Sequence, residues 1–164
     1  MASEPGEVDR ILGHADKLAE CAVARQADAP PAMYWYGPAS FTLQRGLTWH
    51  TLGDARFAER AVAELIEGLR ELPDAERGSE WAAIFTVAVA EALTTTGDAE
   101  YAIEQARHAL TVCRATRSTR LAHALRRAHT RMRNTWPTHA AVRDLGDEVR
   151  GCTLSVPELL HRPQ

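Results

Sequence analysis

The stretch GDAEYAIEQARHAL, residues 97–110, decides the fold. Gly97-Asp98 breaks the apolar segment that precedes it, because glycine followed by aspartate interrupts a helical pattern. Small and apolar residues then recur at spacings of three and four, which predicts an amphipathic helix with one buried face. These residues are Tyr101, Ala102, Ala106, Ala109, Leu110 and Cys113.

The same pattern occurs earlier in the chain. Gly53-Asp54 lies 44 residues before Gly97-Asp98, and an alanine follows each aspartate by four residues. The first copy comprises Gly46, Trp49, Gly53, Asp54, Ala58, Val62 and Leu65, and the second Ala90, Leu93, Gly97, Asp98, Ala102, Ala106 and Ala109. Self-similarity at a fixed spacing indicates a helical repeat.

The remaining segments also predict helices. Apolar stripes favour helices at residues 8–23, up to Leu52, at 54–72, from Ser79, at 118–134 and from Pro137. The segment WAAIFTVAVAEAL, residues 81–93, is apolar nearly all round and should be the most buried helix. Ser79 and Ser118 are expected to cap their helices. No segment shows the alternation of a strand, so the fold is predicted to be all-α.

Both copies of the pattern resemble the tetratricopeptide repeat, in which small residues let two antiparallel helices approach closely. The resemblance implies antiparallel helix pairs stacked as a short solenoid of about seven helices. A single domain is expected over residues 1–164, with loose ends at 1–6 and 152–164. Arg45 and Thr42 depart from the motif, which prefers leucine and tryptophan there, and the period exceeds the usual ~34 residues.

The order of features over residues 28–150 resembles the tetratricopeptide-like C-terminal regions of actinobacterial helix-turn-helix (XRE-type) transcriptional regulators. The resemblance lies in APPAMYWYGPASFTLQRG, the two Gly-Asp helix pairs, ATRSTR and the short closing helix. In that family the region follows a DNA-binding domain and serves sensing and self-association. These 164 residues leave no room for such a domain, so the chain is expected to be either a piece of a longer regulator or a free-standing relative.

Charge is distributed unevenly although the net charge is only −3. Residues 1–104 carry 18 acidic and 8 basic side chains, whereas residues 105–143 carry nine arginines and no acid. On the predicted helix 118–134, Arg120, Arg127 and Arg131 lie together on one flank of the apolar stripe. Three interpretations remain open: a solvated face, a nucleic-acid site, or a surface for an acidic protein, most simply the acidic half of a second copy.

Aligning the two copies predicts which residues face the concave groove of a tetratricopeptide array. The candidate ligand or partner residues are Leu43, Leu47, His50, Glu91 and Thr94. Such a groove is mostly apolar with a few polar points, which suits a helix, a peptide or a small effector better than nucleic acid. Glu91 lies in the most apolar helix, where a carboxylate needs a partner.

Motifs for catalysis or cofactors are missing from the sequence. None of the seven histidines has a partner at the i, i+4 spacing of a helical metal site, and there is no phosphate-binding glycine loop or nucleophile elbow. Cys21, Cys113 and Cys152 are far apart and form no CxxC pair, so buried or idle thiols are expected rather than a disulfide framework. The sequence predicts no cofactor, no metal and no membrane span. It predicts a cytoplasmic location.

The sequence therefore predicts a binding module rather than an enzyme. The leading interpretation is the regulatory tail of a transcriptional regulator, which binds a protein, a peptide or a small effector and forms a homodimer. A free-standing adaptor with a dedicated protein partner is the first alternative. The second is a small helical enzyme that uses His50 and Glu91 in the groove. Direct binding of nucleic acid is not expected.

Overall fold

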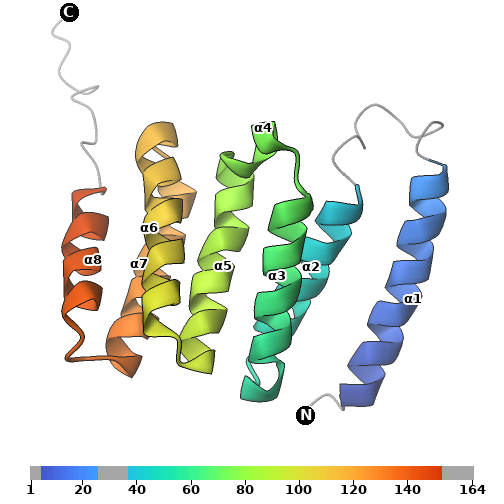
Figure 1. The fold of residues 1–164 in the computed structure, drawn as a ribbon, viewed down its shortest axis with the longest axis horizontal. Coiled ribbons are helices and arrows are strands. Elements are labelled where there is room, and N and C mark those ends of the chain that lie inside the picture. The colour runs from blue at the N-terminus through green and yellow to red at the C-terminus, as the bar shows by residue number, and fades with distance from the viewer. Residues whose placement is uncertain (1–4, 26–36, 153–164) are drawn as a thin grey trace, which may run out of the picture. The chain divides into compact units, whose positions relative to one another are not determined.

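The structure is a computed structural model that describes residues 5–25 and 37–152 (Figure 1). The chain divides into two compact units, Met1–Pro73 and Asp74–Gln164, and each is described by itself. Every regular element in the described ranges is helical, and the all-α prediction is confirmed. The elements are α1 (Pro5–Ala24), α2 (Pro38–Thr51), the 3-10 turn η3 (Ala55–Phe57), α3 (Ala58–Glu71), α4 (Asp74–Arg77), α5 (Glu80–Thr96), α6 (Ala99–Thr116), α7 (Thr119–Thr135) and α8 (Ala140–Gly151).

Helices α2 and α3 form the antiparallel pair at the centre of the first unit. Two glycines bring their backbones together: a Cβ added at Gly46 would lie 2.8 Å from the backbone nitrogen of Leu65. One added at Gly68 would lie 2.9 Å from the backbone nitrogen of Leu43. The prediction that small residues allow a close approach is therefore confirmed for this pair.

Ion pairs connect α1 to this pair of helices. The guanidinium of Arg45, on α2, donates to Asp16 of α1 at 3.0 Å and to Glu64 of α3. Arg60 of α3 pairs with Asp9 at 2.7 Å. Arg45 departs from the tetratricopeptide motif, and these contacts show that it joins three helices through charge where the motif uses a leucine.

The apolar stripe predicted at residues 8–23 is only partly covered. Val8 and Ala19 of α1 are buried, whereas Ile11 and Leu18 are 53% and 59% exposed. These two side chains are spaced seven residues apart and therefore lie on one face of the helix.

Helices α5 to α8 form the second unit. As predicted, α5 is the most buried helix: every residue from Phe85 to Thr94 is buried. Figure 1 shows α5 and α6 running antiparallel, and α7 packs against both of them, while α8 covers α7 and α6. Ala102 and Ala106 of α6 are almost completely buried, as expected for the small residues of a helix pair.

The breaks between helices share one geometry. Gly53 and Gly97 adopt positive φ values of 70° and 92°, and Arg117 does so at 54°. The next residue then accepts a hydrogen bond from a backbone N–H of the following turn: Asp98 from Tyr101 at 3.1 Å and Ser118 from Leu121 at 3.0 Å. Ser118 therefore caps α7 as predicted, and Ser79 caps α5 by accepting from Ala82.

Several predicted boundaries differ from those observed. The helix expected at 54–72 is split, because Asp54 accepts from Arg56 N and holds residues 55–57 in a 3-10 turn. The last helix begins at Ala140, not at Pro137, because Pro137 lies in the turn between Trp136 and His139. Of the ends predicted to be loose, residues 5 and 6 belong to α1 and Cys152 follows α8, while 1–4 and 153–164 lie outside the described residues.

Candidate functional site

Helix α7 separates its apolar and basic residues cleanly. Its inner face is buried against α5, α6 and α8 and consists of Leu121, Ala122, Ala124, Leu125, Ala128 and Met132. Arg120, Arg127 and Arg131 lie together on one flank of this inner face, as the helical spacing predicted. All three are exposed, and they are called the outer face of α7 below. Half-buried Arg126 lies beside them and donates to Nδ1 of His123 at 3.2 Å.

No carboxylate in the described part of the chain neutralises the outer face of α7. Arg120, Arg127 and Arg131 make no ion pair there. Some other arginines of the same unit are paired: Arg107 with Glu148 at 2.9 Å, and Arg150 with Asp147. The outer face of α7 therefore keeps its full positive charge, and an anionic partner would meet it without competition from the unit itself.

Two open cavities border α7, and the second of them reaches the outer face. The larger, of about 560 Å³, lies between the end of α6, the beginning of α7 and the end of α8. The second, of about 490 Å³, follows α7 towards its C-terminal end and is lined by Arg127, Arg131 and Asn134, among others. They share His123 and Arg126 as lining residues, and no described acidic residue lines either one. Positive charge thus continues from one cavity into the next.

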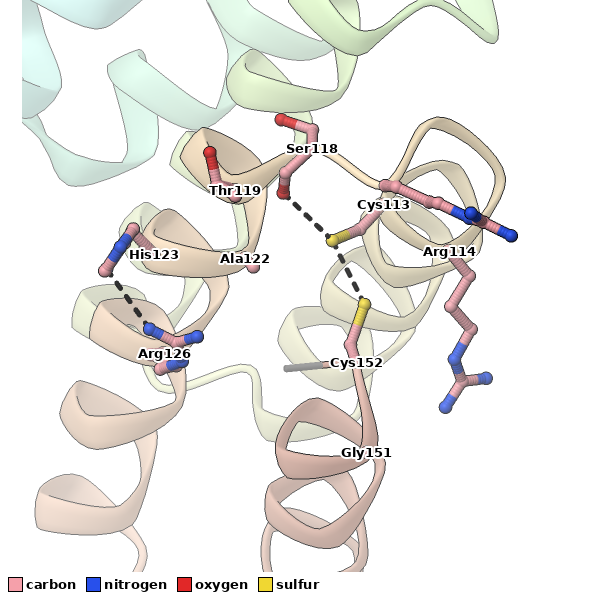
Figure 2. Close-up of a pocket in the computed structure, with 10 residues that line it drawn as sticks. Cys113, Arg114, Ser118, Thr119, Ala122, His123, Arg126, Gly151 and Cys152 are labelled. Atoms are coloured by element: carbon pink, nitrogen blue, oxygen red, sulfur yellow. Dashed lines mark hydrogen bonds between the residues drawn. The ribbon is translucent and has the colours of Figure 1, made fainter. Parts of the chain in front are cut away.

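The larger cavity holds a pair of cysteines (Figure 2). Cys113 lies in the last turns of α6 and Cys152 directly after α8, and their Sγ atoms are 3.1 Å apart. The thiol of Cys152 donates to Cys113 Sγ, and the Cys113 thiol donates to the carbonyl oxygen of Ser118 at 3.6 Å. Cys152 is partly exposed, whereas Cys113 is almost completely buried.

Burial changes the chemistry of the inner thiol. The pKa of the Cys113 thiol is raised to about 12. The largest cause is desolvation, the next is the contact with Cys152, and the carboxylate of Glu80 contributes in the same direction. Glu80 also accepts a hydrogen bond from the Ser118 hydroxyl at 2.6 Å, which holds that carboxylate near the N-terminus of α7. Cys113 therefore remains a neutral thiol at neutral pH.

Three arginines are among the residues that line the same cavity. Arg114, Arg117 and Arg126 all line it, and Arg114 also donates to the backbone carbonyl oxygen of Glu148 at 3.3 Å. Arg117 adopts the left-handed conformation in which glycine is normally favoured, which costs about 1 kcal/mol or more for another residue. A strained arginine at the edge of a cavity is consistent with a binding role.

The residues of the predicted groove fall into the two units. Leu43, Leu47 and His50 lie on α2, and Glu91 and Thr94 lie on α5. Leu43 is completely buried in the α2–α3 contact against Gly68, so its side chain belongs to the core. The groove, which would combine both units, remains a prediction.

The other members of the groove differ in exposure. Leu47 and His50 are half-buried, and Glu91 is buried. Thr94 is buried too, and its hydroxyl donates to the carbonyl oxygen of Ala90 at 2.8 Å, within its own helix.

The described ranges contain no cluster of three or more histidine, cysteine or acidic side chains arranged to hold a metal ion. None of the helices in those ranges is long and apolar enough to cross a bilayer. Comparison with known proteins found no family model, no curated protein and no solved structure that matches the chain. The resemblance to regulator tails therefore stays a prediction.

Sequence reasoning identified the basic face but missed the cysteine pair. Cys113 and Cys152 are 39 residues apart and outside any short motif, so spacing alone gave no signal. The apolar stripe of its helix did predict that Cys113 is buried, and the structure confirms this. Its partner could be identified only from the packing of α8 against α6.

Proposed function

We propose that this chain is a non-catalytic helical-repeat module that binds an acidic protein surface through the outer face of α7, most simply the acidic half of a second copy. One observation carries the proposal: Arg120, Arg127 and Arg131 are exposed together and meet no carboxylate among the described residues. An ordinary protein surface intersperses charges of both signs. Opposite charge on a partner would steer the encounter and fix its register.

The acidic half of the chain supports a second copy as the partner. Residues 1–104 carry a balance of −10, and residues 105–143 carry +9, so that two copies offer each other segments of opposite charge. Residues 1–104 also weigh against nucleic acid as the main partner, because they would repel its phosphates. Self-association is in keeping with the regulator tails that the sequence resembles, so we further propose a regulatory role for the module.

Light scattering coupled to gel filtration tests the proposal. The wild-type chain is expected to be dimeric at about 0.1 M salt and to shift towards monomer at about 1 M, where the screening length falls from about 10 Å to about 3 Å. The triple variant Arg120→Glu, Arg127→Glu, Arg131→Glu should be monomeric at both concentrations while its circular dichroism stays helical. A wild-type mass that neither salt nor this variant changes would overturn the proposal.

Two controls separate charge from other causes. The variant Arg120→Lys, Arg127→Lys, Arg131→Lys keeps the charge and should keep the dimer. Arg143→Glu reverses an exposed arginine on α8, outside the face, and should leave the mass unchanged. Retention of short duplex DNA by the wild type at low salt, lost in the glutamate variant, would instead favour a nucleic-acid site.

A further inference from the structure

The two cysteines in the larger cavity lie close enough to react with each other. The two Sγ atoms lie 3.1 Å apart, although they come from different helices. A disulfide bond measures about 2.05 Å, so bond formation needs a movement of only about 1 Å. Cys152 lies just beyond the last residue of α8, so this movement can be made outside the helix itself.

We propose that Cys113 and Cys152 form a reversible dithiol–disulfide couple, and that a low-molecular-weight disulfide bearing carboxylates oxidises it within the cavity. The cavity opens to solvent and, at about 560 Å³, has room for a small molecule. Its lining includes Arg114, Arg117 and Arg126 and no described acidic side chain. A carboxylate-bearing oxidant therefore meets favourable charge where the sulfurs are.

The two thiols have different roles in the exchange. Partly exposed Cys152 reacts first: its thiolate attacks one sulfur of the small disulfide, the S–S bond of that molecule breaks, and one small thiol leaves with the proton. Cys113 then attacks the Cys152 sulfur of the mixed disulfide and releases the second small thiol, which takes the Cys113 proton. The protein loses two electrons and two protons, and one small disulfide becomes two small thiols.

Neighbouring groups allow the second step although Cys113 is buried. Part of what keeps its thiol neutral is the contact with Cys152, and that part disappears once the Cys152 sulfur is in a mixed disulfide. Arg114 acts in the opposite direction and favours the thiolate. The buried thiol is thus protected from direct oxidation but is in place to close the bond.

The disulfide would join the end of α6 to the end of α8. It would span 39 residues, and closing a loop of that length restricts the unfolded chain. The inference is independent of the proposed function, because Arg120, Arg127 and Arg131 take no part in it. The charge variants of that face should oxidise like the wild type.

The test uses the full chain, reduced and then equilibrated with glutathione and glutathione disulfide. Alkylation of the remaining thiols, followed by peptide mass spectrometry, is expected to find a cross-link between Cys113 and Cys152 and alkylated Cys21. Cys21→Ser is the matched control, since this exposed cysteine is on α1, and it should oxidise normally. A product with glutathione on Cys152 but no cross-link to Cys113 would overturn the proposal.

Single variants test the order of the steps. Cys113→Ser should stop at the mixed disulfide on Cys152, whereas Cys152→Ser should leave Cys113 unreacted. Oxidised wild type should melt higher than reduced protein by on the order of 10 °C, a shift that Cys113→Ser should lack. Attack by Cys113 in the absence of Cys152 would contradict the assigned roles.

The charge of the oxidant tests the part played by the arginines. Cystamine, a cationic disulfide, should oxidise the pair at least about tenfold more slowly than glutathione disulfide. Arg114→Gln with Arg117→Gln should reduce this difference. Equal rates with the two disulfides would overturn the assignment of an anionic oxidant.

Discussion

The α2–α3 and α5–α6 pairs follow one sequence pattern but bring their helices together in different ways. In the first pair, Gly46 and Gly68 let the backbones touch. The positions 44 residues later are Ala90 and Val112, and both side chains are buried in the second unit. The repeated Gly-Asp break thus determines where each pair turns, whereas the size of the residues at the crossing determines how closely the helices can approach.

The strongest test of this comparison adds one methyl group to the closer pair. Gly46→Ala should lower the free energy of unfolding by about 3 kcal/mol, although alanine favours a helix over glycine by about 1 kcal/mol. The added Cβ would lie 2.8 Å from both the backbone nitrogen and Cγ of Leu65, a buried residue, and the backbone atom cannot move without displacing α3. Urea unfolding followed by circular dichroism measures the change.

A glycine in open space provides the control for that measurement. Gly13 lies on α1, and an added Cβ there meets no heavy atom within 4 Å. Gly13→Ala should therefore stabilise the protein by about 0.5–1 kcal/mol through helix propensity. If Gly46→Ala were equally stabilising, the close contact between α2 and α3 would not exist.

The helix breaks offer a second comparison with a smaller expected effect. Gly97 and Arg117 both adopt positive φ, but only Gly97 can do so without steric cost. Arg117→Gly should relieve about 1 kcal/mol of strain and lose part of it to the greater freedom of glycine in the unfolded chain, for a net gain of about 0.5 kcal/mol. Gly97→Ala should have the opposite sign, with a loss of about 1 kcal/mol.

Urea unfolding of Arg117→Gly and Gly97→Ala measures both changes in stability. Arg117→Ala serves as a control, because it removes the same guanidinium but keeps a Cβ at the strained position. It should not show the gain of Arg117→Gly. Equal stability of the alanine and glycine variants would mean that positive φ costs nothing at this break.

Much of this architecture could be predicted from the sequence because it depends on local signals. The Gly-Asp breaks, the serine caps and the apolar stripes all act within one or two helical turns, and they located the helices from α5 to α7. The 3-10 turn at residues 55–57 was missed because it depends on a single hydrogen bond, which the side chain of Asp54 accepts from the N–H of Arg56. The start of α8 was misplaced because proline is as suitable for a turn as for a first helical turn.

The residues of the candidate site also differ in whether local signals could predict them. Arg120, Arg127 and Arg131 lie on one helix, so helical spacing was enough to place them together. Cys113 and Cys152 lie on different helices, and only tertiary packing could bring their sulfurs together. Leu43 was assigned to a groove by alignment, but its burial depends on Gly68 of the neighbouring helix, which leaves space for the leucine side chain.

The contact between α7 and α8 adds a third kind of close approach, in which a glycine faces an aromatic ring instead of a backbone. A Cβ at Gly146 would lie 2.6 Å from Nε2 of His129, and that nitrogen is 3.1 Å from the carbonyl oxygen of Val142. Burial lowers the pKa of His129, and Arg133 and Arg150 act in the same direction against the Val142 carbonyl and Asp147. The neutral ring, donating from Nε2, is therefore the form that the fold favours.

This comparison predicts the direction of a pH effect. The pKa of His129 is lower in the folded than in the unfolded chain, so the unfolded chain binds more protons as the pH falls below about 6.5. The stabilisation is complete above that pH and is lost as the pH falls through the folded-state pKa. The urea concentration at the unfolding midpoint of the wild type should decrease when the pH is lowered from about 7.5 to about 5.5. The decrease should be smaller for His129→Gln, whose amide can also donate to Val142. His108→Gln alters an exposed histidine on α6 and should behave like the wild type. If both variants showed the same pH dependence, the close approach at Gly146 would not require a neutral ring.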